Sequence, residues 1–207
     1  LASFTQAAAP TTTQNIFTWT PENVRLKKSQ YSNTASFDFT PWFIDPVKAI
    51  YGDDWDEINI VAGTGAGKST MLEIMMSYDV TFPTGDDLLY ITQNDGNAAA
   101  FNRDRLQPTL ERTLSTKDLM LSLKDKDKTR EAIKLPHMIL HTVGANMSSL
   151  QELSVGKVLG DEPWNWNSSN LIGEARKRLH DRVDGKLILT SQAGSQEGKG
   201  SEWYDQT

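Results

Sequence analysis

A glycine-rich turn followed by lysine and serine is the part of this sequence best equipped for chemistry. Residues 62–69 read Ala-Gly-Thr-Gly-Ala-Gly-Lys-Ser and lie between an apolar run and an apolar helical pattern. The order and spacing match the phosphate-binding P-loop, except that Ala62 stands where the strict pattern has glycine. The alternative is a glycine-rich turn without a ligand, which the match in this context disfavours. The sequence therefore predicts a nucleoside triphosphate site.

Each residue type in this turn has an expected role. The glycines let the backbone bend and direct its N–H groups at phosphate oxygens, and the N-terminus of the following helix adds positive potential. Lys68 is expected to reach the β- and γ-phosphates, and the Ser69 hydroxyl to bind Mg²⁺. The predicted nucleotide-binding residues here are Ala62, Gly63, Thr64, Gly65, Ala66, Gly67, Lys68, Ser69 and Thr70.

A second motif supplies the acids that hydrolysis requires. The run Val158–Glu162 ends in Asp161 and Glu162, about ninety residues after the P-loop and with two strand candidates between. Asp161 is expected to bind Mg²⁺ opposite Ser69, and Glu162 to orient and deprotonate the attacking water. Adjacent acids are also common in turns, and Gly160 makes the run a poor apolar strand. The spacing favours the catalytic interpretation.

The last apolar run ends in small polar residues. If the strand Leu187–Gly194 lies between the P-loop strand and the acidic strand, Ser191 or Gln192 faces the γ-phosphate and can sense its loss. The alternative is a simple turn at a strand end. Because the guanine-specific N-K-x-D pattern is absent, ATP is the predicted nucleotide.

An arginine that neutralises transition-state charge is harder to choose. Five arginines follow predicted strands: Arg103, Arg105, Arg176, Arg178 and Arg182. Any of them can act in its own subunit or on a neighbour, and most are expected to be solvated helix charges. Arg103 is the candidate we name as catalytic.

Aromatic residues ahead of the P-loop are candidates for a base pocket. Phe39, Trp42 and Phe43 are placed to stack on adenine, and Trp42 is the one we name for nucleotide binding. Ordinary core packing is the alternative interpretation, and it is favoured.

Helical and apolar patterns alternate along the chain in a way that predicts an α/β fold. We expect a P-loop NTPase of the additional-strand type, with a mostly parallel sheet flanked by helices on both faces. The expected strands are 58–61, 86–94, 137–146, 156–162 and 187–194. The expected helices are a short one within 20–31, one beginning near 41, one after the P-loop, one over 97–114 with a break at Pro108, and one over 169–183. Residues 119–123 and 130–135 are expected to form a hairpin around a charged tip.

Length and composition fit one domain. The chain has 207 residues, a net charge of −6 and no cysteine, which excludes disulfides and thiolate metal sites. No apolar run is long enough to cross a bilayer, and the N-terminus lacks the pattern of a secretion signal. We expect a partly irregular arm over residues 1–36 and the ATPase domain over 37–207, the whole being a fragment of a longer protein.

Several segments together resemble the large terminase subunits of tailed bacteriophages, especially the GpA-type branch. The segments, in order, are Thr40–Ile50, the P-loop, Phe101–Leu110, Val143–Glu162 and Glu174–Gly194. The resemblance implies an ATPase motor that packages double-stranded DNA into a procapsid in the host cytoplasm. It also implies a homo-oligomeric ring, a portal protein and a small terminase subunit as partners, with no membrane.

The chain departs from that family at three points. Many terminases carry an arginine inside the P-loop, where this chain has Thr64. The branch usually reads S-T-P where this chain has Ser191-Gln192-Ala193. The family's nuclease domain has no room here, so we expect no DNA cleavage. Another nucleic-acid motor, such as a helicase, and a nucleotide-gated assembly protein without motor activity remain alternatives.

Because the chain is acidic, DNA contact is expected to be local. The run 124–130 carries four basic residues that can touch phosphates, namely Lys124, Lys126, Lys128 and Arg130. Two acids alternate with the lysines, so a solvated zwitterionic tip is an equal alternative.

Overall fold

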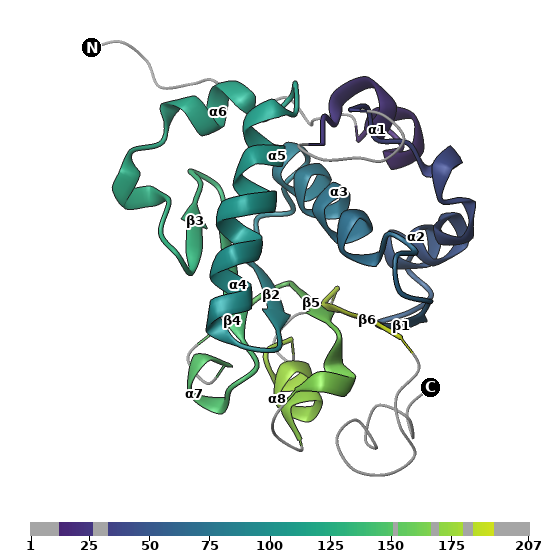
Figure 1. Cartoon of the computed structure of the whole chain (residues 1–207), viewed down its shortest axis with the longest axis vertical. Coiled ribbons are helices and arrows are strands. Elements are labelled where there is room, and N and C mark those ends of the chain that lie inside the picture. The colour runs from purple at the N-terminus through teal and green to yellow at the C-terminus, as the bar shows by residue number, and fades with distance from the viewer. Residues whose placement is uncertain (1–12, 27–32, 151–152, 167–169, 180–183, 193–207) are drawn as a thin grey trace.

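The computed structural model describes residues 13–26, 33–150, 153–166, 170–179 and 184–192. Its centre is a six-stranded sheet in the order β1-β6-β5-β2-β4-β3 (Figure 1). The strands are β1 (Glu57–Val61), β2 (Leu88–Thr92), β3 (Ala132–Lys134), β4 (Ile139–Gly144), β5 (Lys157–Asp161) and β6 (Lys186–Ser191). Every pair is parallel except β3 with β4. The predicted, mostly parallel α/β sheet is confirmed.

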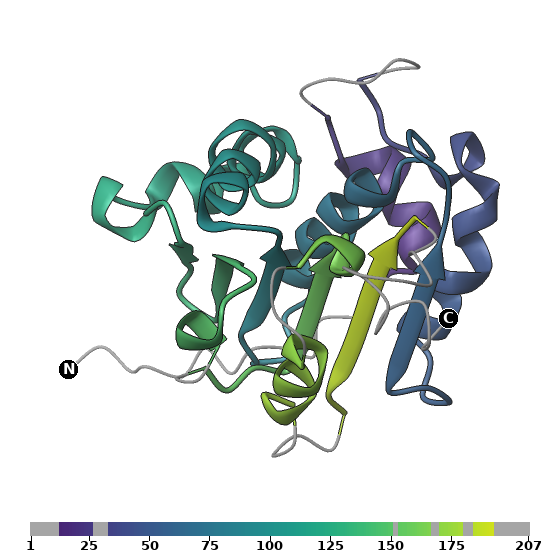
Figure 2. The ribbon, with the colours of Figure 1, turned by 60° about the horizontal axis from the view of Figure 1, so that its bottom comes forward.

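Helices cover both faces of this sheet (Figure 2). The α-helices are α1 (Ile16–Asn23), α2 (Ile44–Ile50), α3 (Lys68–Thr81), α4 (Asp95–Phe101), α5 (Gln107–Arg112), α6 (Lys117–Ser122), α7 (Met147–Leu150) and α8 (Leu171–Lys177). The shorter turns are η1 (Phe37–Phe39), η2 (Pro41–Phe43), η3 (Asn102–Leu106), η4 (Asp125–Asp127) and η5 (Pro163–Asn165). None of the helices in the described ranges has the length and apolar character that crossing a membrane requires.

Alternate strand residues face two separate apolar cores, because successive side chains of a strand point to opposite faces. In β2, Leu88 and Tyr90 join the core formed with α1, α2, α3 and α5, while Leu89 and Ile91 join the core formed with α7 and α8. All five residues of β2 are buried, and its sequence is accordingly apolar from Leu88 to Ile91 rather than alternating.

β6 lies between β1 and β5, which is the arrangement that the additional-strand type requires. Val61 of β1 pairs with Ser191 of β6, and Asp161 of β5 pairs with Thr190 of β6. The carboxyl ends of three parallel strands therefore meet at one edge of the sheet, and the candidate site is built there.

Gly160, which weakens the apolar pattern of β5, is explained by close packing. A Cβ atom at this position would lie 2.5 Å from Cδ2 of Leu189 and 3.0 Å from the ring of Trp166. Only glycine fits between β6 and that ring, so the residue that makes β5 look unlike a strand is required by its place in the sheet.

The helical stretch from α4 to α5 contains a π turn immediately before Pro108. The backbone N–H of Gln107 donates to the carbonyl of Asn102, five residues earlier. Proline cannot donate the next bond of an α-helix and its ring crowds the preceding turn, so the wider turn absorbs it. The break predicted at Pro108 is thus a local widening within a continuous helical stretch.

Three predictions of local structure were wrong. Residues 119–123 do not form a strand of a hairpin, because 117–122 form α6 and β3 pairs with β4 instead. The N-terminal segment contains α1 before residue 20, capped by the side chain of Asn15, whereas we expected irregular chain there and a helix within 20–31. Residues 27–32 lie outside the described ranges. His137, expected in a strand, precedes β4, and only His141 lies in it.

Candidate nucleotide-binding and hydrolysis site

The P-loop connects β1 to α3 and folds around the ammonium group of Lys68. Gly65 and Gly67 adopt φ values of 79° and 95°, a left-handed backbone that side-chain-bearing residues rarely adopt. Lys68 Nζ donates to the carbonyls of Ala62, at 2.9 Å, and Gly63, at 3.1 Å. Its side chain is only 6% exposed, so the positive charge is held inside the turn.

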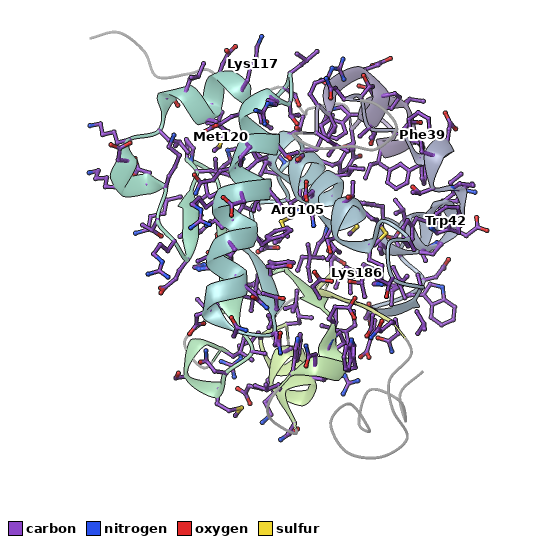
Figure 3. The ribbon with its side chains drawn as sticks, in the orientation of Figure 1. Phe39, Trp42, Arg105, Lys117, Met120 and Lys186 are labelled. Carbon is purple, nitrogen blue, oxygen red and sulfur yellow. The ribbon has the colours of Figure 1, made fainter. Side chains whose placement is uncertain are left out.

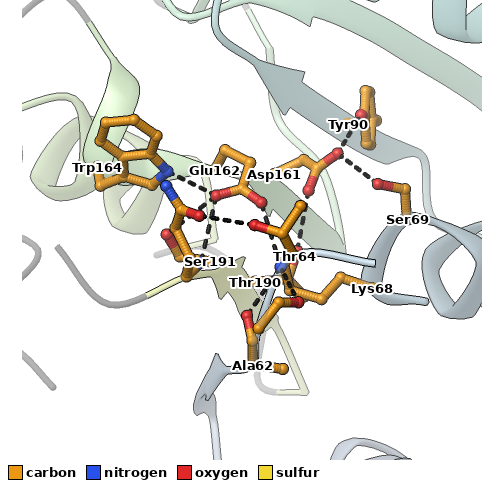
Figure 4. Close-up of polar contacts among 12 residues, drawn as sticks. Ala62, Thr64, Lys68, Ser69, Tyr90, Asp161, Glu162, Trp164, Thr190 and Ser191 are labelled. Atoms are coloured by element: carbon orange, nitrogen blue, oxygen red, sulfur yellow. Dashed lines mark hydrogen bonds and ion pairs between the residues drawn. The ribbon is translucent and has the colours of Figure 1, made fainter. Parts of the chain in front are cut away.

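The structure brings the P-loop and the acidic pair together (Figure 4). Ser69 Oγ donates to Oδ2 of Asp161 at 3.1 Å, and Lys68 Nζ lies 3.3 Å from Oε1 of Glu162. These four residues come from the start of α3 and the end of β5, which are separated by about ninety residues in sequence. The two motifs therefore face one common point.

Three hydroxyl groups surround the carboxylate of Asp161. Besides Ser69, Tyr90 donates to Oδ2 at 2.9 Å and Thr190 donates to Oδ1 at 3.2 Å. Burial raises the pKa of Asp161 above its usual value, and the hydrogen bonds from Tyr90 and Ser69 oppose that shift. The carboxylate is buried and is oriented by hydroxyl groups from three elements.

The Glu162 carboxylate is held by the groups next to it. Trp164 Nε1 donates to Oε2 at 2.6 Å, the backbone N–H of Gln192 at 3.2 Å, and Ser191 Oγ at 3.4 Å. Glu162 itself has φ 53° and ψ 53°, a left-handed conformation that is costly for a residue other than glycine. The strained backbone and these donors aim the carboxylate back toward Lys68.

The end of β6 connects the two motifs directly. The backbone N–H of Ala62 donates to the carbonyl of Ser191 at 2.9 Å, and Thr64 Oγ1 donates to Oε1 of Gln192 at 3.0 Å. Gln192 thus contacts the P-loop through its side chain and Glu162 through its backbone. β6 therefore lies between the other two strands, as the prediction for Ser191 and Gln192 assumed, and their contact with a γ-phosphate stays a prediction.

The residues present fit a magnesium ion shared with a nucleotide. Ser69 and Asp161 offer hard oxygen ligands close to each other, which Mg²⁺ prefers. Within the described ranges, no group of three His, Cys, Asp or Glu side chains is placed to enclose a metal. A site with one carboxylate and one hydroxyl suits Mg²⁺ that takes its other ligands from phosphate and water.

A cavity of about 1220 Å³ opens beside the P-loop, on the side of the segment 33–46. Phe39 and Trp42 line it together with Val61, and these two aromatic side chains lie on the same side of the molecule in Figure 3. Trp42 Nε1 donates to the carbonyl of Ala66 at 3.2 Å, which ties the ring to the loop. Phe43 is only 1% exposed and belongs to the apolar core. For this residue the alternative interpretation, core packing, is confirmed.

The described arginines have different surroundings. Arg103 pairs with Asp104, its neighbour in sequence, and its side chain is 72% exposed, so it is not held by the cluster of Figure 4. Arg105 pairs with Glu73 and donates to Thr70 in the first turn of α3. The remaining pairs are Arg176 with Glu57 and Arg178 with Glu174. Arg182 lies outside the described residues.

Sequence reasoning missed three residues of the site. Tyr90 and Thr190 are buried strand residues, and Trp164 follows the acidic pair, yet each hydrogen-bonds a carboxylate of that pair. An aromatic or hydroxyl residue within an apolar strand is compatible with any sheet. The strand order could have identified Thr190, because this residue lies directly opposite Asp161 when β6 pairs with β5.

The basic run 124–130 forms a short turn beside the antiparallel edge of the sheet. Asp127 accepts from the backbone N–H of Lys124 at 3.1 Å, and Lys128 lies 3.6 Å from Glu111. Lys124, Lys126 and Arg130 are exposed. The run is a turn with three exposed cations, and Lys128 near its end forms an antiparallel bridge with Ile133; the predicted first hairpin strand at 119–123 is replaced by α6.

Comparisons with known proteins identify the family and the fold. Residues 29–200 match the family described as the phage terminase large subunit gpA, ATPase domain. The crystal structure of the HK97 bacteriophage large terminase superposes with a TM-score of 0.73 at 14% identity, over 92% of this chain and 40% of that one. The large terminase ATPase domain of Thermus phage P74-26 gives a TM-score of 0.55 at 14% identity, over 81% of this chain and 71% of that one.

The structural likeness, at such low identity, concerns the fold, and this chain spans about 40% of the length of the HK97 protein. Among curated proteins no significant match is found. The family match covers the P-loop, the acidic pair and β6, which are the elements that form the site. The chain therefore belongs to the family of gpA-type phage terminase large subunit ATPase domains.

Proposed function

We propose that this domain hydrolyses ATP with Mg²⁺ and uses the energy to move double-stranded DNA into a procapsid. The observation that carries the proposal is the convergence of Lys68 and Ser69 with Asp161 and Glu162 at the ends of neighbouring strands. A phosphate-binding loop alone requires no acid pair at this place. The family match supports the motor interpretation, and translocation itself is part of the proposal.

Each residue then has a definite role. The P-loop N–H groups and Lys68 bind the phosphates, which requires Lys68 to leave the carbonyls that hold it and its pairing with Glu162. Ser69 and Asp161 hold Mg²⁺, which neutralises charge on the β- and γ-phosphates when bound. Glu162, released from Lys68, orients the attacking water and accepts its proton.

The cavity beside the P-loop is the proposed place for the base. Trp42 and Phe39 give it two exposed aromatic surfaces, and Trp42 is fixed to the loop by its hydrogen bond to Ala66. Stacking on aromatic faces accepts any base, so these contacts favour nucleotide binding without selecting adenine. ATP rather than GTP follows from the absence of the guanine-recognition motif.

The ends of the strands offer a route for coupling hydrolysis to movement. Gln192 contacts Thr64 in the P-loop and Glu162 in the acidic pair, so a change at the γ-phosphate alters both contacts. For the transition-state charge, Arg103 is our candidate, acting on a neighbouring subunit of a ring from its exposed position. Portal protein and small terminase subunit are the proposed partners, within the host cytoplasm.

A hydrolysis assay with a matched lysine control tests the proposal. Lys68→Ala removes the phosphate-binding cation and is expected to abolish ATP turnover. Lys48→Ala removes an exposed lysine of α2 that pairs with Asp45, and it is expected to leave turnover unchanged. Equal activity in the two variants contradicts the proposed role of the P-loop.

The same assay separates the competing functions. Turnover that rises when duplex DNA and procapsid portals are added supports packaging. Strand separation without a response to portals supports a helicase, and nucleotide binding without turnover supports an assembly protein gated by nucleotide.

A further inference from the structure

The helix that follows the P-loop, α3, contains a buried carboxyl group, that of Glu73. The proposed hydrolysis does not use this group. Glu73 is one turn after Ser69 on α3, and its side chain is 4% exposed. Burial raises the pKa of Glu73, while Arg105 and a hydrogen bond from Thr109 oppose the shift. Thr109 Oγ1 donates to Oε2 at 3.2 Å, and Arg105 forms an ion pair with Oε1.

Arg105 belongs to the π turn η3 and contacts α3. In Figure 3 it lies between α3 and the α4–α5 stretch. Its Nη2 donates to Thr70 Oγ1 at 3.2 Å, and its guanidinium carbon lies 5.7 Å from the centre of the Phe101 ring. Thr70 is the residue directly after Ser69, so one planar cation contacts α3 at two points, Thr70 in its first turn and Glu73 in its second.

The same guanidinium leads to the acidic strand through aromatic rings. Phe101 stacks on Tyr90, with ring centres 4.1 Å apart and planes inclined by 12°. Tyr90 in turn donates its hydroxyl to Asp161. A continuous set of contacts thus runs from the start of the P-loop helix, through η3 and β2, to the end of β5.

We propose that Arg105 is a positioning residue of the ATPase site. It holds the first turn of α3, which carries Ser69, against the aromatic pair that supports Asp161. The two oxygen ligands expected for Mg²⁺ are thereby kept at a fixed separation. The inference rests on the proposed function, because it assigns Arg105 to the metal ligands that this function requires.

A simpler role would be to balance the charge of Glu73. Removing one member of a buried pair leaves an uncompensated charge and destabilises the fold, whereas removing both relieves that penalty. The double variant Glu73→Gln/Arg105→Gln therefore separates the two roles. It removes the unpaired charge and still lacks the contact with Thr70.

The test measures Mg²⁺ coupling, the ratio of the dissociation constants of a fluorescent non-hydrolysable ATP analogue without and with Mg²⁺. Groups that orient metal ligands typically change metal affinity by about 10–100-fold, so Arg105→Gln is expected to lower the ratio at least about tenfold. The double variant is expected to regain thermal stability relative to Arg105→Gln and to keep the low ratio. Arg105→Lys is also expected to have a low ratio, because lysine lacks the planar fork.

Arg112→Gln is the matched control. Arg112 is exposed on α5 and donates to the carbonyl of Pro108 at 3.4 Å, away from α3, so its coupling ratio should equal that of wild type. A wild-type ratio in the double variant or in Arg105→Gln overturns the inference, as does a wild-type domain whose affinity ignores Mg²⁺. A wild-type domain that shows the coupling but does not hydrolyse ATP refutes the proposed hydrolysis instead, and the ratio still decides the role of Arg105.

Discussion

The carboxylate of Asp161 accepts hydrogen bonds from hydroxyls of three different elements, α3, β2 and β6. The three donors fall into two roles. Ser69 is the expected partner in metal binding, while Tyr90 and Thr190 fix the carboxylate on its other sides. Replacing a residue that holds a metal ligand in place typically costs about 10–100-fold in metal affinity or activity.

Tyr90→Phe tests this arrangement at the level of a single atom. The variant keeps the ring and its stacking on Phe101 but removes the hydroxyl that orients Asp161. We expect the concentration of Mg²⁺ needed for half-maximal ATPase activity to rise about tenfold, with little change in thermal stability. An unchanged Mg²⁺ requirement, measured by titration at saturating ATP, would show that Ser69 and Thr190 suffice to hold the carboxylate.

Elements marked by particular residue types at a fixed spacing, such as the P-loop, could be predicted from sequence. Elements whose type is decided by packing against the rest of the fold, such as α6 and α1, could not. The P-loop has glycines and a lysine that few other turns require, and the acidic pair closes an apolar run. In contrast, Leu119–Leu123 is a short apolar run, and such runs do not distinguish a strand from a buried helix. α1 contains Pro21 and two threonines, which disfavour a helix, and the burial of Trp19 outweighs them. Tyr90 could be assigned to the site only once the structure showed that β2 lies next to β5.

Helix α1 packs into the apolar core, and Trp19→Ala tests this at the scale of the element. Trp19 is 1% exposed and makes edge-to-face contacts with Tyr78 and Phe82 at the end of α3. Replacing it is expected to reduce the free energy of unfolding by about 3–5 kcal/mol. Trp55→Ala, at a position 62% exposed, is the control and should change it by less than about 0.5 kcal/mol. Equal, small effects in denaturant unfolding would mean that α1 is not part of the core.

At the scale of the whole molecule, the residues of the candidate site lie at the carboxyl ends of β1, β5 and β6. The exposed cations of 124–130 lie beside β3, the antiparallel strand at the side of the sheet. The net charge of −6 means that binding to DNA must come from such a local group. Strands β2 and β4 lie between β5, which carries Asp161, and β3, so the two regions belong to one sheet. In the proposed function DNA is contacted through its phosphates, which needs no recognition of bases.

A triple variant, Lys124→Gln/Lys126→Gln/Arg130→Gln, tests the assignment of that surface. We expect weaker binding to duplex DNA and a smaller dependence of the logarithm of affinity on the logarithm of salt concentration. The slope should fall by about 0.9 for each DNA phosphate that the variant no longer neutralises. Lys48→Gln changes one exposed charge on α2 and should leave the slope as it is. The same slope in the triple variant as in wild type would assign DNA binding to another surface.

Glu162→Gln is the most direct test of the central claim, that the P-loop and the acidic pair act on a single Mg²⁺-bound triphosphate. The amide keeps the size of the side chain but cannot accept the proton of water, so ATP binding should persist while turnover falls by at least about 100-fold. Binding of ATP and single-turnover hydrolysis should be measured on the same preparation. Retained binding with lost hydrolysis is the predicted result, and near-normal turnover would contradict the account.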